Sequence, residues 1–187
     1  MKLEDLLSQK KSSILKKWFH LVIETYPAET SRFLIKQTDQ FANPVGHTIS
    51  QGLEAFYEEL LVRSAPDKIS PFIDALIRVR AIQDFSPSQA IAFIFLLKKV
   101  LREELEKEIQ ERQNFEELLI IESRIDELAL RSFELYMKCR EKLYELRATE
   151  VKNRYFRLLE RAQLICSIPE DEKDLTKGTD DTPSNAR

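Results

Sequence analysis

Hydrophobic residues recur every three or four positions along most of the chain, the spacing that places side chains on one face of an α-helix. The first such series covers residues 2–25 and is stopped by Pro27. The second covers residues 30–43, with Phe41 near its end, and the third covers residues 46–63. No segment shows the period of two that is typical of strands. The pattern therefore predicts an all-α protein.

Two serine–proline pairs mark the starts of the next two helices. A serine just before a helix accepts hydrogen bonds from free backbone N–H groups, and proline fits the first helical position. Ser70–Pro71 predicts a fourth helix. Ser86–Pro87 predicts a fifth over residues 87–112, in which Gln89 completes a capping box. Residues 90–97 are apolar on every side of this helix, which predicts a central helix surrounded by protein.

The longest predicted helix covers residues 115–165, which contain neither proline nor glycine. Such a helix would reach roughly 75 Å, more than twice the width of a small domain, so part of it is expected to project as a stalk. These elements predict a globin-like helical domain of about six helices over residues 1–150. The end of the long helix follows over 151–168, and a polar, disordered tail over 169–187.

The long helix carries two series of apolar residues whose registers differ by one residue, a skip that locally alters supercoiling. The first series contains Tyr136, Cys139, Leu143 and Leu146, and the second contains Val151, Tyr155, Leu158, Ala162 and Ile165. In a coiled coil, a partner helix covers apolar residues at this spacing. We therefore predict a homodimer with the second series as its interface. The alternative is a helix that folds back along its own domain.

Composition and charge exclude several classes of function. The net charge of −3 argues against a nucleic-acid-binding protein, because phosphate contacts need a basic surface. Only Gly46 and Gly52 lie in the folded part, too few for a phosphate-binding glycine loop. Cys139 and Cys166 stand far apart with no histidine cluster near them, which predicts reduced thiols and no metal site. The acidic N-terminus and the short apolar run at 90–97 predict a cytoplasmic protein without membrane insertion.

Candidate chemistry is confined to two histidines and one cysteine. Histidine is a common haem ligand, but neither His20 nor His47 lies on the central helix or on the helix before it. We therefore predict no cofactor, with His47 as the ligand in the event that haem binds. Lys138 and Arg140 flank Cys139 and would favour a reactive thiolate, whereas the simpler interpretation is a small apolar residue. No Ser/His/Asp or Cys/His arrangement emerges, so we predict that the chain is not an enzyme.

The stretch Asn43–Gly46 is open to two interpretations. It is the most individual loop-like segment of the sequence and could form a functional surface. Alternatively, Asn-Pro-Val-Gly forms a turn with a glycine in the left-handed conformation.

Three blocks of residues stand out from the helical pattern. The first contains Trp18-Phe19, Tyr26-Pro27, Thr30, Phe33-Leu34, Asp39, Phe41 and Asn43-Pro44-Val45-Gly46; the second contains Arg80, Asp84 to Ala90, and Phe93; the third contains Arg124 to Leu130, Tyr136-Met137, Cys139 to Lys142, and Arg147. Over about residues 3–150 these blocks resemble the amino-terminal domain of RsbRD-type stressosome co-antagonist proteins.

The resemblance implies a globin-like fold without haem, a dimer, and sensory input to an anti-anti-sigma output domain. In full-length co-antagonists a carboxy-terminal STAS domain follows and is phosphorylated by a partner kinase. No β/α pattern follows Ile165, so we expect that output domain to be missing. Stand-alone domains of this kind are similar to proteins encoded near anaerobic sulfur-respiration systems, which suggests a redox partner.

A globin-like fold without haem also raises the question of what fills the haem space. That space is either filled by side chains or left as an apolar pocket. We predict a small apolar cavity between the first and central helices, lined by Phe93 and by Trp18 or Phe19.

Together these features predict a non-catalytic sensory or adaptor module. We expect it to dimerise and to relay a signal to a partner protein from a signalling or redox system. One alternative is a haem- or tetrapyrrole-binding globin that senses gas or redox state. Another is a structural subunit of a larger complex.

Overall fold

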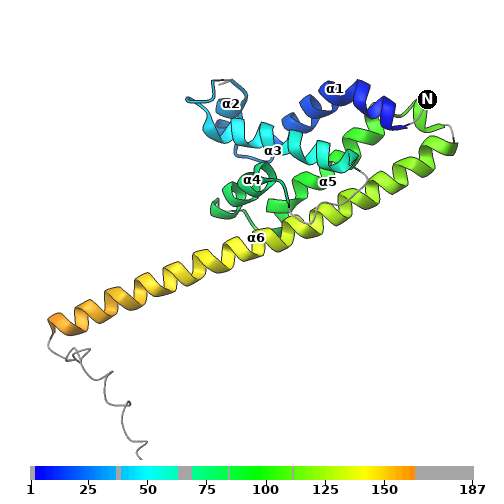
Figure 1. Ribbon diagram of the computed structural model, residues 1–187. Helices are drawn as coiled ribbons and strands as arrows, with labels where there is room; N and C mark the ends of the chain where they lie inside the picture. Colours follow the sequence, from blue (N-terminus) through cyan, green and yellow to red (C-terminus); the bar gives the residue numbers. More distant parts are fainter. Residues whose placement is uncertain (1–2, 37–38, 63–68, 84, 111, 163–187) are drawn as a thin grey trace, which may run out of the picture. The chain divides into compact units, whose positions relative to one another are not determined.

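The computed structural model describes residues 3–36, 39–62, 69–83, 85–110 and 112–162, and the chain divides into two compact units, Met1–Tyr144 and Glu145–Arg187. The helices are α1 (Leu3–Ile23), α2 (Ala28–Lys36), α3 (Pro44–Leu61), α4 (Pro71–Ile82), α5 (Pro87–Glu104), the 3-10 helix η1 (Glu108–Gln110) and α6 (Arg112–Arg161), shown in Figure 1. The described residues contain no strand, and the all-α prediction with a long closing helix is confirmed.

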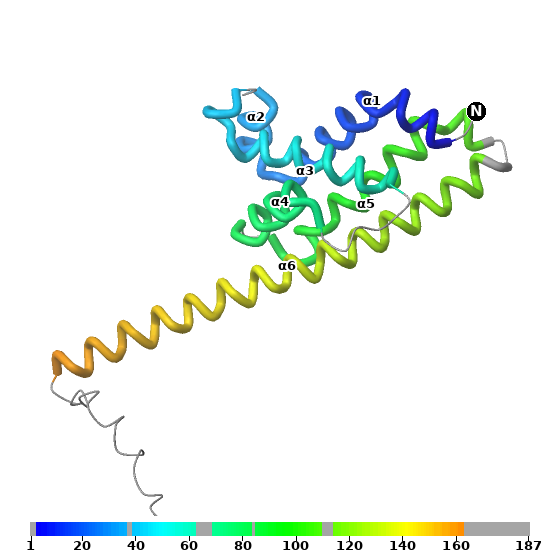
Figure 2. The backbone as a smooth tube through the Cα atoms, viewed as in Figure 1, coloured from blue at the N-terminus to red at the C-terminus, as the bar shows by residue number. Residues whose placement is uncertain are grey.

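The core of the first unit is built around α1. This helix packs against α5 and α3, and α3 packs against α4; Figure 2 traces this arrangement. Trp18 of α1 is fully buried and lies edge-on to Phe56 of α3 and stacked on Phe93 of α5. Its indole N–H donates to the Phe93 carbonyl at 2.7 Å, which satisfies the polar end of the ring inside an apolar core.

Helix α6 closes the first unit along one of its faces. Its buried hydrophobic residues follow helical spacing and are Leu118, Ile121, Ile125, Leu128, Ala129 and Tyr136. Beside this face, Arg102 of α5 donates two hydrogen bonds to the carboxylate of Glu122, at 2.7 and 2.8 Å. Lys98 of α5 pairs with Asp126 one turn further along. Apolar burial and flanking ion pairs together align α6 with α5.

The structure corrects the predicted boundary between the second and third helices. Helix α2 begins at Ala28 and ends at Lys36, and Phe41 is 93% exposed instead of lying on a helix face. Helix α3 begins at Pro44, so Gly46 is helical and does not form the predicted left-handed turn. The reason is that Asn43 caps α3: its side-chain oxygen accepts from Gly46 N at 2.8 Å, and its amide donates to the Leu34 carbonyl.

The two serine–proline starts are confirmed, but the enclosure of the fifth helix is not. Ser70 caps α4, and Ser86 forms the predicted capping box with Gln89 at the start of α5. Helix α5 ends at Glu104, earlier than predicted, and Phe95 is 46% exposed. The prediction of a helix surrounded on all sides is therefore wrong, because the packed helices cover part of its circumference and leave the face around Ala92 open.

Candidate functional site

An apolar groove opens on the first unit between α5 and α6. Pro87, Ala92 and Phe95 of α5 and Leu130 and Phe133 of α6 line it, and its volume is about 740 Å³. Leu130 is 71% exposed and Phe133 is 42% exposed. Contiguous exposed apolar side chains of this kind mark surfaces that contact other molecules. The sequence interpretation missed this groove because it assigned the apolar residues of α5 to the core.

The predicted dimer interface lies on the part of α6 that belongs to the second unit. Its described members, Val151, Tyr155, Leu158 and Ala162, are all exposed, and we call them the exposed seam. The fifth predicted member, Ile165, lies outside the described residues, as do Cys166 and the predicted tail. The steps of four, three and four residues place these side chains on one face of the helix.

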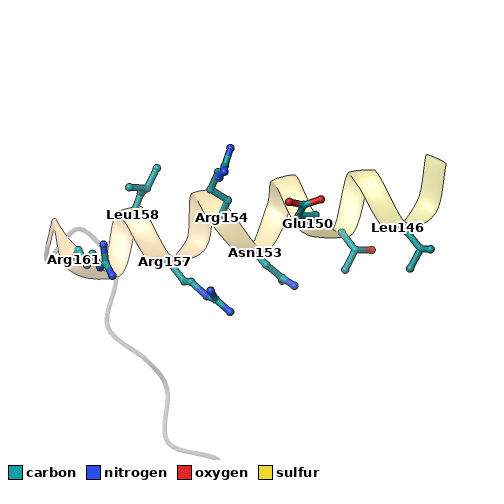
Figure 3. A pocket seen from close by; sticks show the side chains of 8 residues that line it. Leu146, Glu150, Asn153, Arg154, Arg157, Leu158 and Arg161 are labelled. Atoms are coloured by element: carbon teal, nitrogen blue, oxygen red, sulfur yellow. The ribbon is translucent and has the colours of Figure 1, made fainter. Parts of the chain in front are cut away.

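Beside the exposed seam, the same helix end presents a basic face. Figure 3 shows Arg154, Arg157 and Arg161 along this helix end, together with Asn153, the acidic Glu150 and Leu158 of the exposed seam. This half of the helix surface is suited to water, whereas the seam is not. The helix end is therefore amphipathic on its own.

The first predicted series of the long helix has a different environment from the exposed seam. Tyr136 is 1% exposed, Cys139 and Leu143 are partly buried, and only Leu146 is open. Tyr136 and Cys139 pack on the core of the first unit, whereas Leu146 belongs to the second unit and is exposed. The first series is thus partly buried, and the described members of the second series are all exposed.

Tyr136 and Arg140 attach α6 to the connection between α4 and α5. The Tyr136 hydroxyl donates to the Phe85 carbonyl at 3.2 Å, and Arg140 Nη1 donates to the Ala81 carbonyl at 3.0 Å. The two side chains stand one helical turn apart: Arg140 binds the last turn of α4, and Tyr136 binds Phe85 just before the cap of α5.

Cys139 does not have the surroundings of a reactive thiol. Burial raises the pKa of its thiol, and the charge of Arg78 offsets this only in part. The flanking cations have other partners: Lys138 pairs with Glu134 at 2.6 Å, and Arg140 binds the Ala81 carbonyl. The hypothesis of a thiolate favoured by its two neighbours in sequence is therefore wrong, because both of these side chains point their charge elsewhere.

The residues proposed for an apolar pocket are brought together in part. Trp18 and Phe93 stack in the core with no exposed surface, whereas Phe19 is partly buried and its ring contacts that of the exposed His20. His47 lies half-buried in the first turn of α3. The apolar pocket and the assignment of His47 as the haem ligand stay predictions. Across the described ranges, no group of three or more His, Cys, Asp or Glu side chains is placed to hold a metal ion.

The fold and these surfaces define a class: an all-helical domain whose open apolar faces are suited to contacts with other protein chains. None of the described helices has the length and apolarity needed to span a membrane. The model of the RsbT co-antagonist protein rsbRD N-terminal domain family matches residues 12–151, and the chain belongs to this family. It is a stressosome-related family of signalling domains. No curated protein and no solved structure matches the chain.

Proposed function

We propose that the chain is a non-catalytic signal-input module that forms a homodimer through the exposed seam and relays a signal to a partner protein. The observation that carries the proposal is the exposure of the seam. Val151, Tyr155 and Leu158 are 52%, 62% and 53% exposed, yet they follow the spacing of a coiled-coil interface. A regular apolar row on a helix surface is stabilised when a second helix covers it.

The relay is supported by the continuity of α6. One uninterrupted helix, Arg112–Arg161, carries both the residues that bind the α4–α5 connection and the exposed seam. A helix transmits displacement and rotation along its axis because its backbone hydrogen bonds hold each turn to the next. We infer that a change at the α4–α5 connection alters the presentation of the seam to the second copy and to the partner protein.

Sedimentation of matched variants tests the dimer. Leu158→Glu places a charge in the seam, where burying it is unfavourable, and we expect a monomer. Leu146→Glu is the control, because Leu146 has nearly the same exposure, 56% against 53%, but lies on another face of the helix. It is expected to leave the dimer intact. A wild-type chain that sediments as a monomer at about 200 µM, or two variants that behave alike, would contradict the proposal.

A further inference from the structure

A buried arginine that pairs with no carboxylate of the described residues stands out in the first unit. Arg80 of α4 has no exposed surface, and its Nη2 donates to the Thr25 hydroxyl at 3.1 Å, while Nε and Nη1 have no hydrogen-bond partner. Its guanidinium lies over the rings of Tyr26, Phe85 and Phe93, at 5.3, 4.5 and 4.9 Å from the ring centres. No Asp or Glu of the described ranges pairs with it. Ring faces attract the charge but leave two donor nitrogens unsatisfied.

An open cleft, which Arg80 itself does not line, has in its wall residues that contact this guanidinium. Its volume is about 560 Å³, within the size range of small-molecule sites, and its wall includes Thr25, Tyr26 and Phe85. These are three of the four residues that the Arg80 guanidinium touches. The buried charge is therefore separated from the cleft by a single layer of side chains.

Two side-chain amides supply donors at the cleft. The side-chain oxygen of Gln83 accepts from the Tyr26 hydroxyl at 3.1 Å, and that of Gln89 accepts from Ser86 N at 3.0 Å. One lone pair of each amide oxygen is thus engaged, and the N–H groups of the two amide nitrogens can donate to a ligand. Thr30 adds a hydroxyl, and among the residues that the structure describes no acidic side chain lines the cleft.

Two helix starts also border the cleft. Its wall contains residues of the first turn of α2, which begins at Ala28, and of the first turn of α5, which begins at Pro87. The N-terminal ends of helices carry partial positive charge and favour anions. The buried cation, the free amide donors and the two helix starts all favour the same sign of ligand.

We propose that this cleft binds a small organic carboxylate. The amides of Gln83 and Gln89 hold the carboxylate in the field of Arg80, and the rings of Tyr26 and Phe85 cover the apolar part of the ligand. A planar carboxylate matches the donor pair, and the aromatic wall favours an organic anion over a mineral one.

The role of this cleft as the input site of a signalling module rests on the proposed function, whereas the binding of a carboxylate does not. Gln83 and Phe85 belong to the α4–α5 connection that α6 holds through Tyr136 and Arg140. Phe85 therefore both lines the cleft and binds Tyr136 of α6.

Calorimetric titration with sodium benzoate tests the site, with benzyl alcohol as the uncharged ring and inorganic phosphate as the mineral anion. We expect benzoate alone to bind saturably. Gln83→Glu, which puts a negative charge into the cleft, should weaken benzoate binding by at least about tenfold. Gln51→Glu makes the same change at an exposed position of α3 and should have no effect. Equal binding to all three proteins, binding of phosphate in place of benzoate, or no benzoate binding up to about 10 mM would overturn the proposal.

A second variant separates a ligand role for the arginine from a packing role. Arg80→Met keeps the length of the side chain and removes the unpaired charge, so we expect the thermal unfolding midpoint to stay level or rise while benzoate binding is lost. A lower midpoint with wild-type benzoate binding would show a packing residue only. Benzoate should also bind to Leu158→Glu with wild-type affinity, because the cleft lies within one chain; a failed dimer test therefore leaves this site standing.

Discussion

Two tyrosines on the same helix illustrate how differently the two units treat their apolar faces. Tyr136 is 1% exposed, and its hydroxyl is bound to the Phe85 carbonyl, so it closes the core of the first unit. Tyr155, in the second unit, is 62% exposed. Both belong to apolar series with the same helical spacing. The difference shows that spacing identifies the face of a helix that needs a cover but leaves open whether that cover comes from the same chain.

The difference also separates stability from association. Burial within the unit contributes to the free energy of unfolding of a single chain, whereas the exposed seam contributes only when a second chain is present. Substitutions in the two regions are therefore expected to change different measured quantities. Four comparisons follow from this separation.

The largest effect is expected from truncating a buried residue of α6. Ile125→Ala removes a fully buried side chain and should lower the free energy of unfolding by about 2–5 kcal/mol. Leu158→Ala, in the exposed seam, should change it by less than about 0.5 kcal/mol in dilute protein. Urea unfolding followed by fluorescence reports on the first unit, because Trp18 is the only tryptophan. Equal losses in the two variants would show that the seam is part of the folded unit.

Raising the pH into the alkaline range is expected to lower the free energy of unfolding of the first unit through the buried Tyr57 of its core. Tyr57 donates its hydroxyl to the Leu7 carbonyl at 3.0 Å, and burial raises its pKa in the folded state. Above pH of about 10 the unfolded chain releases the phenol proton and the folded chain keeps it. The free energy of unfolding should then fall as the pH rises, by at most about 1.4 kcal/mol per pH unit for this group. Below that pH range the contribution of Tyr57 to stability is fully present.

Tyr57→Phe isolates this effect from the other groups that titrate in alkali. At pH 8 the variant should be less stable than wild type by about 1 kcal/mol, the value of the lost hydrogen bond. Between pH 8 and pH 11 this deficit should shrink or reverse, because the variant has no phenol at position 57 to deprotonate. Tyr155→Phe is the control for the loss of a phenol oxygen at a largely exposed position, and it should be as stable as wild type at pH 8. An unchanged deficit at pH 11 would contradict the assignment.

A smaller effect is expected from the bond between α6 and the α4–α5 connection. Tyr136→Phe deletes the hydroxyl that donates to the Phe85 carbonyl and should cost about 0.5–1.5 kcal/mol. Tyr155→Phe should cost nothing measurable. The same two variants test the relay: hydrogen exchange of the amides of the α4–α5 connection should become faster in Tyr136→Phe alone. Unchanged exchange in that variant would show that the connection is held by other contacts.

The helix starts show what local sequence signals determine. Ser70 and Ser86 could be assigned as caps because the residues that satisfy the first backbone N–H groups are adjacent in sequence. Asn43–Pro44 carries the same signal, but its following Gly46 suggested a turn. The structure resolves the ambiguity through a long-range bond, since the Asn43 amide donates to the Leu34 carbonyl of the preceding helix. Only the folded chain brings that carbonyl to the cap.

The candidate functional surfaces also differ in how far the sequence alone could predict them. Spacing alone identifies the apolar residues of the exposed seam, whereas their use as a dimer interface stays a prediction. The groove around Phe95 could not be predicted, because an apolar helix looks alike whether the packed helices enclose it or leave one side open. Arg80 could not be assigned a role either. Among the described residues it has no carboxylate partner, and the groups around it come from the segment after α1, from the residue before the cap of α5 and from α5 itself.

The smallest effect concerns the charges that flank the exposed seam, and it tests the orientation of the proposed dimer. If Ala148, Val151, Tyr155 and Leu158 form the interface of a parallel pair, Arg147 of each copy lies opposite Lys152 of the other, which is a like-charge contact made twice. Lys152→Glu turns both contacts into attractions worth about 0.2–1 kcal/mol each.

The dimer dissociation constant of Lys152→Glu should therefore fall by about threefold to tenfold at low ionic strength, measured by sedimentation equilibrium. The gain should be largely lost in about 1 M salt, because exposed charges are screened. Lys152→Gln removes the repulsion without adding attraction, so its dimer dissociation constant should lie between those of wild type and Lys152→Glu. In an antiparallel pair Arg147 and Lys152 do not face each other, so an unchanged dissociation constant in a confirmed dimer would reverse the orientation of the two helices while leaving the exposed seam as their interface.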